Sequence, residues 1–340
     1  MKVWEKIEEK QFSSLYLLYG TEDFIINETK QKLVTNVLTE EEMDFNFSVY
    51  DLEETPIEEA IEDAETFPFM GDNKLLFLHK PVFLTADKSK GKVEHDIKRL
   101  ETYLQSPAPY SILVFIASYE KLDERKKITK LLKKNAEVLE AKPLNERDLK
   151  VWVRTQANAN KIDMDEDAIE LFVTLVGTDL MNLHSELTKL SLYVSDTKKI
   201  NVSTVEKLTS RSMEQNIFDL VDKVVNRKME EAFRIYYDLR KQNEEPIKIL
   251  ALIASQFRLI YQVKEMTRRG YGQQQIAGTI KTHPYRVKLA SGQANSFSEA
   301  ELGEIMQLLA KTDEQLKTSQ FGKEVALELF LLKLGNMKGK

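Results

Sequence analysis

Short apolar runs in the first 140 residues constrain the fold more than any other feature of the sequence. They lie at residues 15–19, 47–52, 74–78, 111–117 and 136–139, and helical patterns separate them. The runs at 15–19, 74–78 and 111–117 hold almost no polar residue, as expected of strands buried on both faces. Such strands, joined through helices, indicate a parallel sheet covered on both sides. The sequence therefore predicts a doubly wound α/β domain.

Helical spacing of apolar residues places the connecting helices. We expect helices over residues 22–38, from Pro56 to Ala64, over 92–104 and over 125–134. Proline at the first turn of the second helix is favourable because its missing N–H has no helical partner there. Acidic runs at residues 40–42 and 53–54 are typical of solvated helix ends rather than of acid/base pairs.

The strand signal stops after Leu144, and the rest of the chain is expected to be helical. One helix begins at Asn145, and Asp163 is expected to cap a helix that ends before Gly177. Two more are expected over 180–193 and 202–208, followed by seven over 216–226, 228–242, 246–269, 273–280, 283–291, 298–315 and 323–334. These patterns predict three domains: an α/β domain over 1–142, a small helical domain over 143–211 and an all-α domain over 212–340.

Composition excludes several classes of protein and site. The chain has no Cys, which excludes disulfides, thiolate nucleophiles and cysteine-based zinc sites. The four His are isolated, no metal-binding spacing or nucleophile-elbow motif is present, and no metal or cofactor is expected. The first residues lack a signal-peptide core, and no run approaches the about 18 apolar residues of a membrane span. We expect a cytoplasmic protein that does not act at a membrane.

The turn after the first expected strand is where a doubly wound sheet usually binds its ligand. It reads Gly20-Thr21-Glu22-Asp23, whereas a phosphate-binding loop needs a second glycine and a lysine that are missing here. The two carboxylates would also repel a triphosphate. The third strand runs into His79-Lys80 rather than into acidic residues that organise Mg²⁺. The sheet looks like an ATPase core without its nucleotide machinery.

An apolar segment stands out in a connection that should lie on the surface. Phe67-Pro68-Phe69-Met70 precedes the third strand, although loops are normally polar because their backbone must stay hydrated. One interpretation is that Phe67 and Phe69 tuck under the preceding helix as a satellite core. The other is an apolar wedge offered to a partner protein, since exposed aromatic and Met side chains mark interface anchors. In an extended stretch, one alternating pair would be buried and the other presented.

Basic clusters occur at residues 121–134 and around Arg258, Lys264, Arg268 and Arg269. A solvated helix face explains them, and so does contact with the nucleic-acid backbone, which needs only positioned positive charge. Phe321 lies between two expected helices, where it belongs to the core or stacks on a base. The net charge of −6 argues against a uniformly basic face. The candidate DNA contacts are therefore local: Lys126, Lys127, Arg268, Arg269 and Phe321.

In these features the whole chain resembles the delta-subunit family of bacterial DNA polymerase III, the clamp-loader "wrench" of the AAA+ superfamily. The resemblance rests on the turn at residues 16–22, the segment Phe67–Met70, and Gly177–Leu183 followed by Glu186–Leu190. In the last domain it rests on 216–222, 283–288 and 308–317. It implies a RecA/AAA+-like α/β domain, a small helical lid and a helical collar domain that joins subunits.

The resemblance also implies a role. Delta subunits bind the ring-shaped sliding clamp and hold one interface open, without hydrolysing ATP, in a pentamer with delta-prime and the tau/gamma subunits around primed DNA. The clamp-binding element maps onto Phe69, with Phe67, Pro68 and Met70 beside it. The degenerate nucleotide site maps onto Gly20, Thr21 and Glu22, and onto Met181, where ATP-binding relatives carry an arginine.

The sequence leaves two other functions open. An active ATPase would need a working phosphate turn, and the residues after the first strand argue against one. A clamp-independent AAA+-like adaptor or DNA-binding scaffold would keep the fold and bind no clamp. Such a protein would show DNA binding that falls steeply with salt.

Overall fold

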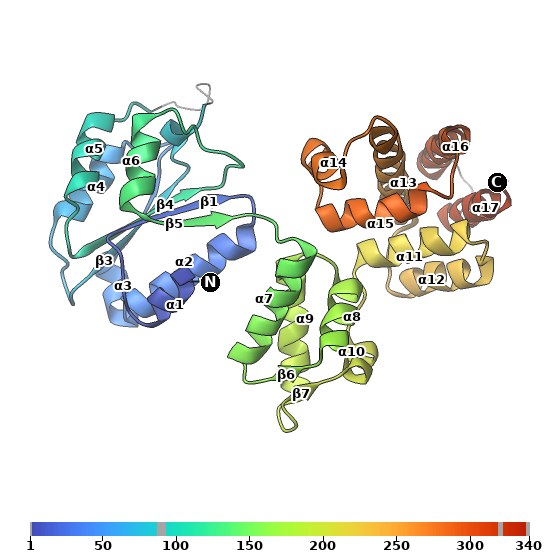
Figure 1. Ribbon diagram of the computed structural model, residues 1–340, viewed down its shortest axis with the longest axis horizontal. Helices are drawn as coiled ribbons and strands as arrows, with labels where there is room; N and C mark the ends of the chain where they lie inside the picture. Colours follow the sequence, from blue (N-terminus) through green and yellow to red (C-terminus); the bar gives the residue numbers. More distant parts are fainter. Residues whose placement is uncertain (1, 87–92, 319–321, 338–340) are drawn as a thin grey trace. The chain divides into compact units, whose positions relative to one another are not determined.

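The computed structural model describes residues 2–86, 93–318 and 322–337 (Figure 1). The chain divides into two units, one up to Pro143 and one from Leu144 onward. The further division expected between residues 211 and 212 remains a prediction. No helix among the described residues is long and apolar enough to cross a membrane.

The first unit is built on a sheet of five parallel strands in the order β2-β3-β4-β1-β5. Its strands are β1 (Leu15–Gly20), β2 (Phe47–Asp51), β3 (Lys74–His79), β4 (Ser111–Ala117) and β5 (Glu137–Ala141). Every residue of β1 and β4 is buried, which explains why their sequences do not alternate. The predicted α/β fold class is confirmed.

Helices cover both faces of this sheet (Figure 1). They are α1 (Lys2–Glu8), α2 (Asp23–Val37), α3 (Glu40–Asn46), α4 (Ile57–Glu65), α5 (Ile97–Gln105), α6 (Lys127–Asn135) and the short 3₁₀ turn η1 (Val82–Leu84). The chain crosses from β1 to the edge strand β2 and then returns through β3 and β4 to β5. Because such crossovers are right-handed, the reversal puts α2 on one face and α4, α5 and α6 on the other.

Two helices of the first unit were not predicted, and one begins later than expected. α1 and α3 are each seven residues long, and α3 buries only Asn46, so it has no apolar stripe to reveal it. α1 buries Val3, Trp4 and Ile7, a helical spacing that was overlooked in the sequence. The helix expected from residue 92 begins at Ile97, where the side chain of Asp96 accepts a hydrogen bond from the N–H of Arg99 at 3.0 Å. That cap, and the polar residues before it, fix the later start.

The second unit begins with four helices: α7 (Glu146–Ala159), α8 (Glu166–Val176), α9 (Leu180–Tyr193) and α10 (Val202–Leu208). The bounds of α9 and α10 match the prediction. Asp163 does not cap α8, because Asp163 and Met164 form the strand β6, which pairs with β7 (Lys199–Ile200). Asp165 takes the cap position instead. A two-residue ladder leaves no periodic pattern from which it could have been predicted.

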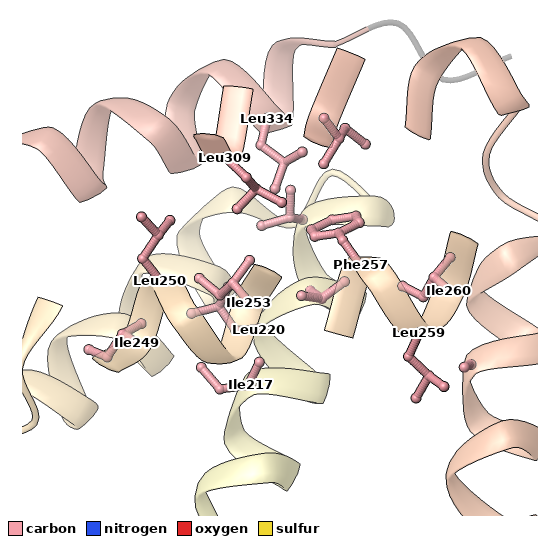
Figure 2. Packing of buried hydrophobic residues seen from close by; sticks show 14 of the residues in the cluster. Ile217, Leu220, Ile249, Leu250, Ile253, Phe257, Leu259, Ile260, Leu309 and Leu334 are labelled. Carbon is pink, nitrogen blue, oxygen red and sulfur yellow. The ribbon is translucent and has the colours of Figure 1, made fainter. Parts of the chain in front are cut away.

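The remaining helices surround one long apolar helix. They are α11 (Met213–Val225), α12 (Met229–Lys241), α13 (Pro246–Arg268), α14 (Gln273–Ile280), α15 (Pro284–Ala294), α16 (Glu299–Thr318) and α17 (Lys323–Asn336). Figure 2 shows Leu250, Ile253 and Phe257 of α13 gathered with side chains of α11, α16 and α17. This core confirms the predicted helical C-terminal region.

Candidate functional site

The apolar segment lies in the connection from α4 to β3, here called the docking loop (residues 66–73). Because the loop leads into β3, it lies at the end of the sheet where the parallel strands begin, here called the amino edge; the end where they finish is called the carboxyl edge. The turn after Gly20 lies at the opposite edge, roughly 16 Å away along a strand of six residues. The two candidate sites of the first unit are therefore separate.

Both phenyl rings of the docking loop are presented to solvent. Phe67 is 78% exposed and Phe69 is 76% exposed, while Met70 is also exposed and Pro68 is partly buried. The Phe67 ring lies beside the ring of Tyr110, with centroids 4.6 Å apart. The satellite-core interpretation is therefore wrong for Phe67 and Phe69, and the loop offers both rings on its surface.

One buried side chain fixes the backbone of the docking loop. Asn46, at the end of α3, is fully buried, and its Oδ1 accepts a hydrogen bond from the N–H of Phe69 at 3.0 Å. Its Nδ2 donates to the carbonyl oxygen of Met70. The amide thus satisfies two consecutive backbone positions that would otherwise be held only by water.

The C-terminal end of α4, where the docking loop begins, is also fixed by a buried side chain. Buried Lys74 donates from Nζ to the carbonyl oxygen of Asp63 at 2.8 Å and to Thr66 Oγ1 at 2.7 Å, and pairs with the Asp63 carboxylate. An ammonium group at a helix C-terminus is favourable because the last carbonyls carry partial negative charge. Burial by itself would raise the pKa of Asp63, but hydrogen bonds from Lys74, Ser48 and Tyr50 outweigh it and lower that pKa.

The first residue of β4 and the residue before it bind the same end of α4. Tyr110 donates its hydroxyl to the carbonyl oxygen of Glu65 at 2.8 Å, and Ser111 donates to that of Ala64 at 2.7 Å. With Lys74, three consecutive carbonyls of α4 therefore have side-chain donors. The docking loop therefore starts from a backbone position that three side-chain donors fix.

The unpredicted helix α3 adds a further aromatic ring. Phe45 stacks on Phe69 with ring centroids 5.0 Å apart. The start of α3 carries a signal that could have revealed it: Thr39 and Glu42 form a capping box, with Thr39 N–H donating to Glu42 Oε2 at 2.8 Å. The acidic run at residues 40–42 is therefore the first turn of a helix that supports the docking loop.

At the other edge of the sheet, the turn after β1 cannot offer the N–H groups of Thr21 and Glu22 to a phosphate. The N–H groups of Thr21 and Glu22 both donate to the carbonyl oxygen of Ala141, at 2.9 and 3.0 Å. Gly20 has φ +132°, and a Cβ on it would lie 2.0 Å from that same oxygen. In a phosphate-binding loop such N–H groups point at the ligand, whereas here β5 occupies them.

The acidic metal-binding position expected of an ATPase at the end of β3 is also absent. Lys80 follows β3 and pairs with Asp51 at 2.6 Å and with Glu53 at 3.2 Å. Within the described ranges, no three His, Asp or Glu side chains come together as a metal ion requires. Met181 lies in the first turn of α9, in the second unit, with about half of its surface exposed.

The four basic candidate DNA contacts already have partners within the protein. Lys126 donates to the carbonyl oxygens of Phe83 at 2.9 Å and Thr85 at 2.6 Å, and Lys127 pairs with Glu101. Arg268 and Arg269 both pair with Glu265, at 2.9 and 2.7 Å. Phe321 lies outside the described residues. Their contact with DNA remains a prediction, and it would require these side chains to share or exchange their present acceptors.

Comparison with known proteins gives the same family from sequence and from structure. Family models for the DNA polymerase III delta subunit match residues 16–142, and for its C-terminal domain residues 214–334. The DNA polymerase III subunit delta of Bacillus subtilis is 48% identical over 332 residues, which span 98% of this chain and 96% of that protein. A probable DNA polymerase III subunit delta of Aquifex aeolicus is 23% identical over 75% of this chain and 72% of its own length.

The folds agree over the same length. The solved structure of the Bacillus subtilis DNA clamp loader delta protein superposes with a TM-score of 0.88 at 48% identity, covering 98% of both chains. Both parts of the sequence that the family models describe, the α/β unit and the helical C-terminal region, are present here in the expected order. The chain therefore belongs to the DNA polymerase III delta subunit family.

Proposed function

We propose that this chain binds the sliding clamp through the docking loop and holds one interface of the ring open while the ring is loaded onto primed DNA. The observation that carries the proposal is the pair of largely exposed phenyl rings, Phe67 and Phe69, on a loop fixed by buried side chains. Aromatic anchors in a rigid setting carry much of the energy of protein interfaces.

Binding can open the ring only through a difference in affinity. Burying one phenyl ring in a pocket of the clamp contributes about 1.5–3 kcal/mol. The chain shifts the clamp toward its open form by as much as it binds that form more tightly than the closed one. Each 1.4 kcal/mol of that difference changes the ratio of open to closed rings about tenfold.

We infer that the chain hydrolyses no ATP itself. The N–H groups of Thr21 and Glu22 donate hydrogen bonds to the carbonyl oxygen of Ala141, and the turn has no lysine for the phosphates. Met181 stands where the family resemblance implies an arginine in ATP-binding subunits. The nucleotide-driven step would then come from the tau/gamma subunits, in a pentamer with delta-prime that works in the cytoplasm.

The outer face of α17 supports a role for the second unit in that pentamer. Val325, Leu329 and Leu332 follow one another at helical spacing and are each about half exposed, while the opposite face of α17 is buried in the core. A helix that is apolar all round is normally buried on all sides. We propose that the helical C-terminal domain of another clamp-loader subunit covers this face.

The test is ring opening by the full chain. A sliding clamp from the same organism carries a fluorescence donor and acceptor on either side of one ring interface. Adding the chain should lower energy transfer in a saturable way, and Phe69→Ala should shift the midpoint to a higher concentration. A chain that binds DNA with a steep salt dependence and leaves the ring closed would instead be a clamp-independent adaptor.

A further inference from the structure

The apolar surface of the docking loop continues onto α3. Phe45 of α3 is 55% exposed, although its ring stacks on that of Phe69, and Met43 is exposed on the same helix. A stack between two rings that both stay more than half exposed removes little apolar surface from water, so it contributes little to folding. Together these side chains form a larger apolar patch than the loop alone provides.

The loop and α3 are joined so closely that they must meet a partner together. Asn46 bonds the backbone of Phe69 and Met70 from the end of α3. Gly71 has φ +64°, and a Cβ there would lie 1.7 Å from Oε1 of the Glu42 side chain, so this turn contacts a side chain of α3. Because the phenyl rings are stacked and the backbone is fixed, a pocket that covers Phe69 also meets Phe45.

The charged residues of α3 and of the docking loop are all acidic. Glu40, Glu41 and Asp44 are exposed on α3, and Asp72 is exposed on the docking loop. The loop itself carries no basic residue, and the nearby Lys74 is buried and paired with Asp63. A partner surface must therefore be apolar where it receives the rings and complementary in charge around these carboxylates, since like charges brought together there cost affinity.

We propose that α3 is the second half of the clamp-docking surface. Phe45 contacts the sliding clamp directly, and Glu41 and Asp44 favour a clamp pocket bordered by basic side chains. The inference rests on the proposed function, which supplies the clamp as the occupant. It adds a contact residue from an element separate in sequence from the loop, and it adds a charge requirement on the partner.

The contact is tested by measuring the affinity of the full chain for the sliding clamp. Phe45→Ala should weaken binding about tenfold, as expected for partial burial of one phenyl ring. Tyr193→Ala is the matched control, because Tyr193 is 59% exposed but lies on α9 in the second unit, and it should leave the affinity unchanged.

A double variant separates direct contact from support of Phe69. In a Phe69→Leu background, which keeps binding measurable, Phe45→Ala should still cause a several-fold loss of affinity. If Phe45 only positions the Phe69 ring, the second substitution causes no further loss, and that result overturns the direct contact.

The charge requirement is tested by the association rate at low salt. Glu41→Lys and Asp44→Lys, made separately, should each slow association roughly threefold or more at about 50 mM salt and lose most of that effect at high salt. Asp167→Lys on α8 changes the net charge equally away from the patch and should leave the rate unchanged. Unchanged or faster association for both α3 variants would overturn the charge requirement.

The outcomes distinguish this inference from the proposed function. If Phe69→Ala binds the clamp as tightly as the unchanged chain, the docking loop is not the anchor and the proposed function fails with it. If Phe69→Ala weakens binding while the α3 variants do not, the docking loop stands and only the inference about α3 fails.

Discussion

Asn46 fixes the backbone of the docking loop through two hydrogen bonds, although it lies outside the loop. Asn46→Ala removes the donor to Met70 and the acceptor for Phe69. We expect a loss of about 1–3 kcal/mol in the free energy of unfolding, since buried polar groups lose their partners. Clamp affinity should fall as well, because the loop must then be ordered on binding. Chemical denaturation and clamp titration measure the two effects.

A second asparagine provides the control. Asn135, at the end of α6, donates from Nδ2 to the carbonyl oxygen of Leu104 at 2.9 Å, so its amide is bonded to α5 rather than to the docking loop. Asn135→Ala should lower stability and leave clamp affinity unchanged. Equal loss of affinity in both variants would mean that the effect of Asn46 is general and does not act through the loop.

His283 makes the second unit sensitive to pH. Its Nδ1 accepts a hydrogen bond from the N–H of Tyr285 at 3.1 Å, and its Nε2 contacts the carbonyl oxygen of Leu144, so the neutral ring satisfies both. Burial lowers the pKa of His283 below the ordinary 6.5, and the hydrogen bond to Leu144 only partly opposes this. The unfolded chain therefore takes up the proton first, and the stabilisation present above pH 6.5 is lost as the pH falls through the lowered pKa.

The free energy of unfolding should fall by about 1 kcal/mol, comparable to one hydrogen bond, between pH 7.5 and 5.5. His283→Asn keeps a good helix cap for α15 without a titrating ring. Calorimetric unfolding of the two proteins at both pH values tests this. The variant should lose less stability on acidification, and an equal loss in both proteins would contradict the assignment.

At the level of single residues, the sequence identifies the presented side chains but not those that hold them. Phe67 and Phe69 can be found because apolar residues in a surface loop break a general rule. Asn46 lies 23 residues before Phe69, and a lone asparagine has no periodic or motif signal. Its role comes from the pairing of β2 with β3, which brings the end of α3 beside the loop.

Among the elements, a buried ion pair between Lys74 and Asp63 joins α4 to β3. Lys74→Met leaves the carboxylate of Asp63 without its cationic partner and the carbonyl oxygen of Asp63 without its side-chain donor. Because removing one partner of a buried pair leaves a charge uncompensated, we expect a loss of about 3 kcal/mol in the free energy of unfolding. Denaturation with urea measures it. Lys130→Met, at an exposed position on α6, should change stability by less than about 0.5 kcal/mol.

Elements with a clear apolar pattern were predicted well, and most elements without one were not. The buried strands and the helices α9, α10 and α14 agree with the sequence, because burial on one or both faces leaves a clear pattern over six or more residues. α3 buries only Asn46, and the strands of the β6–β7 ladder have two residues each, so neither leaves an apolar pattern. α1 was missed although Val3, Trp4 and Ile7 are buried at helical spacing. The start of α5 was placed too early because charged residues before Asp96 are compatible with a helix by propensity alone.

Across the molecule, the first unit keeps the architecture of a nucleotide-binding sheet, and under the proposed function it binds its partner at the opposite edge. The carboxyl edge, where such sheets usually bind ligands, has its turn closed by Ala141. The amino edge carries the fixed docking loop and α3. In the second unit, the half-exposed apolar face of α17 is a surface for another subunit under the proposed function. This arrangement fits a clamp-loader subunit that acts by binding.

The most direct test is isothermal titration of the full chain with the sliding clamp of the same organism, without nucleotide. We predict saturable binding that Phe69→Ala weakens about tenfold or more, while the thermal unfolding midpoint stays unchanged because the ring is exposed. The proposed binding through the docking loop would be contradicted if the clamp bound the unsubstituted chain, Phe69→Ala and Phe67→Ala with equal affinity.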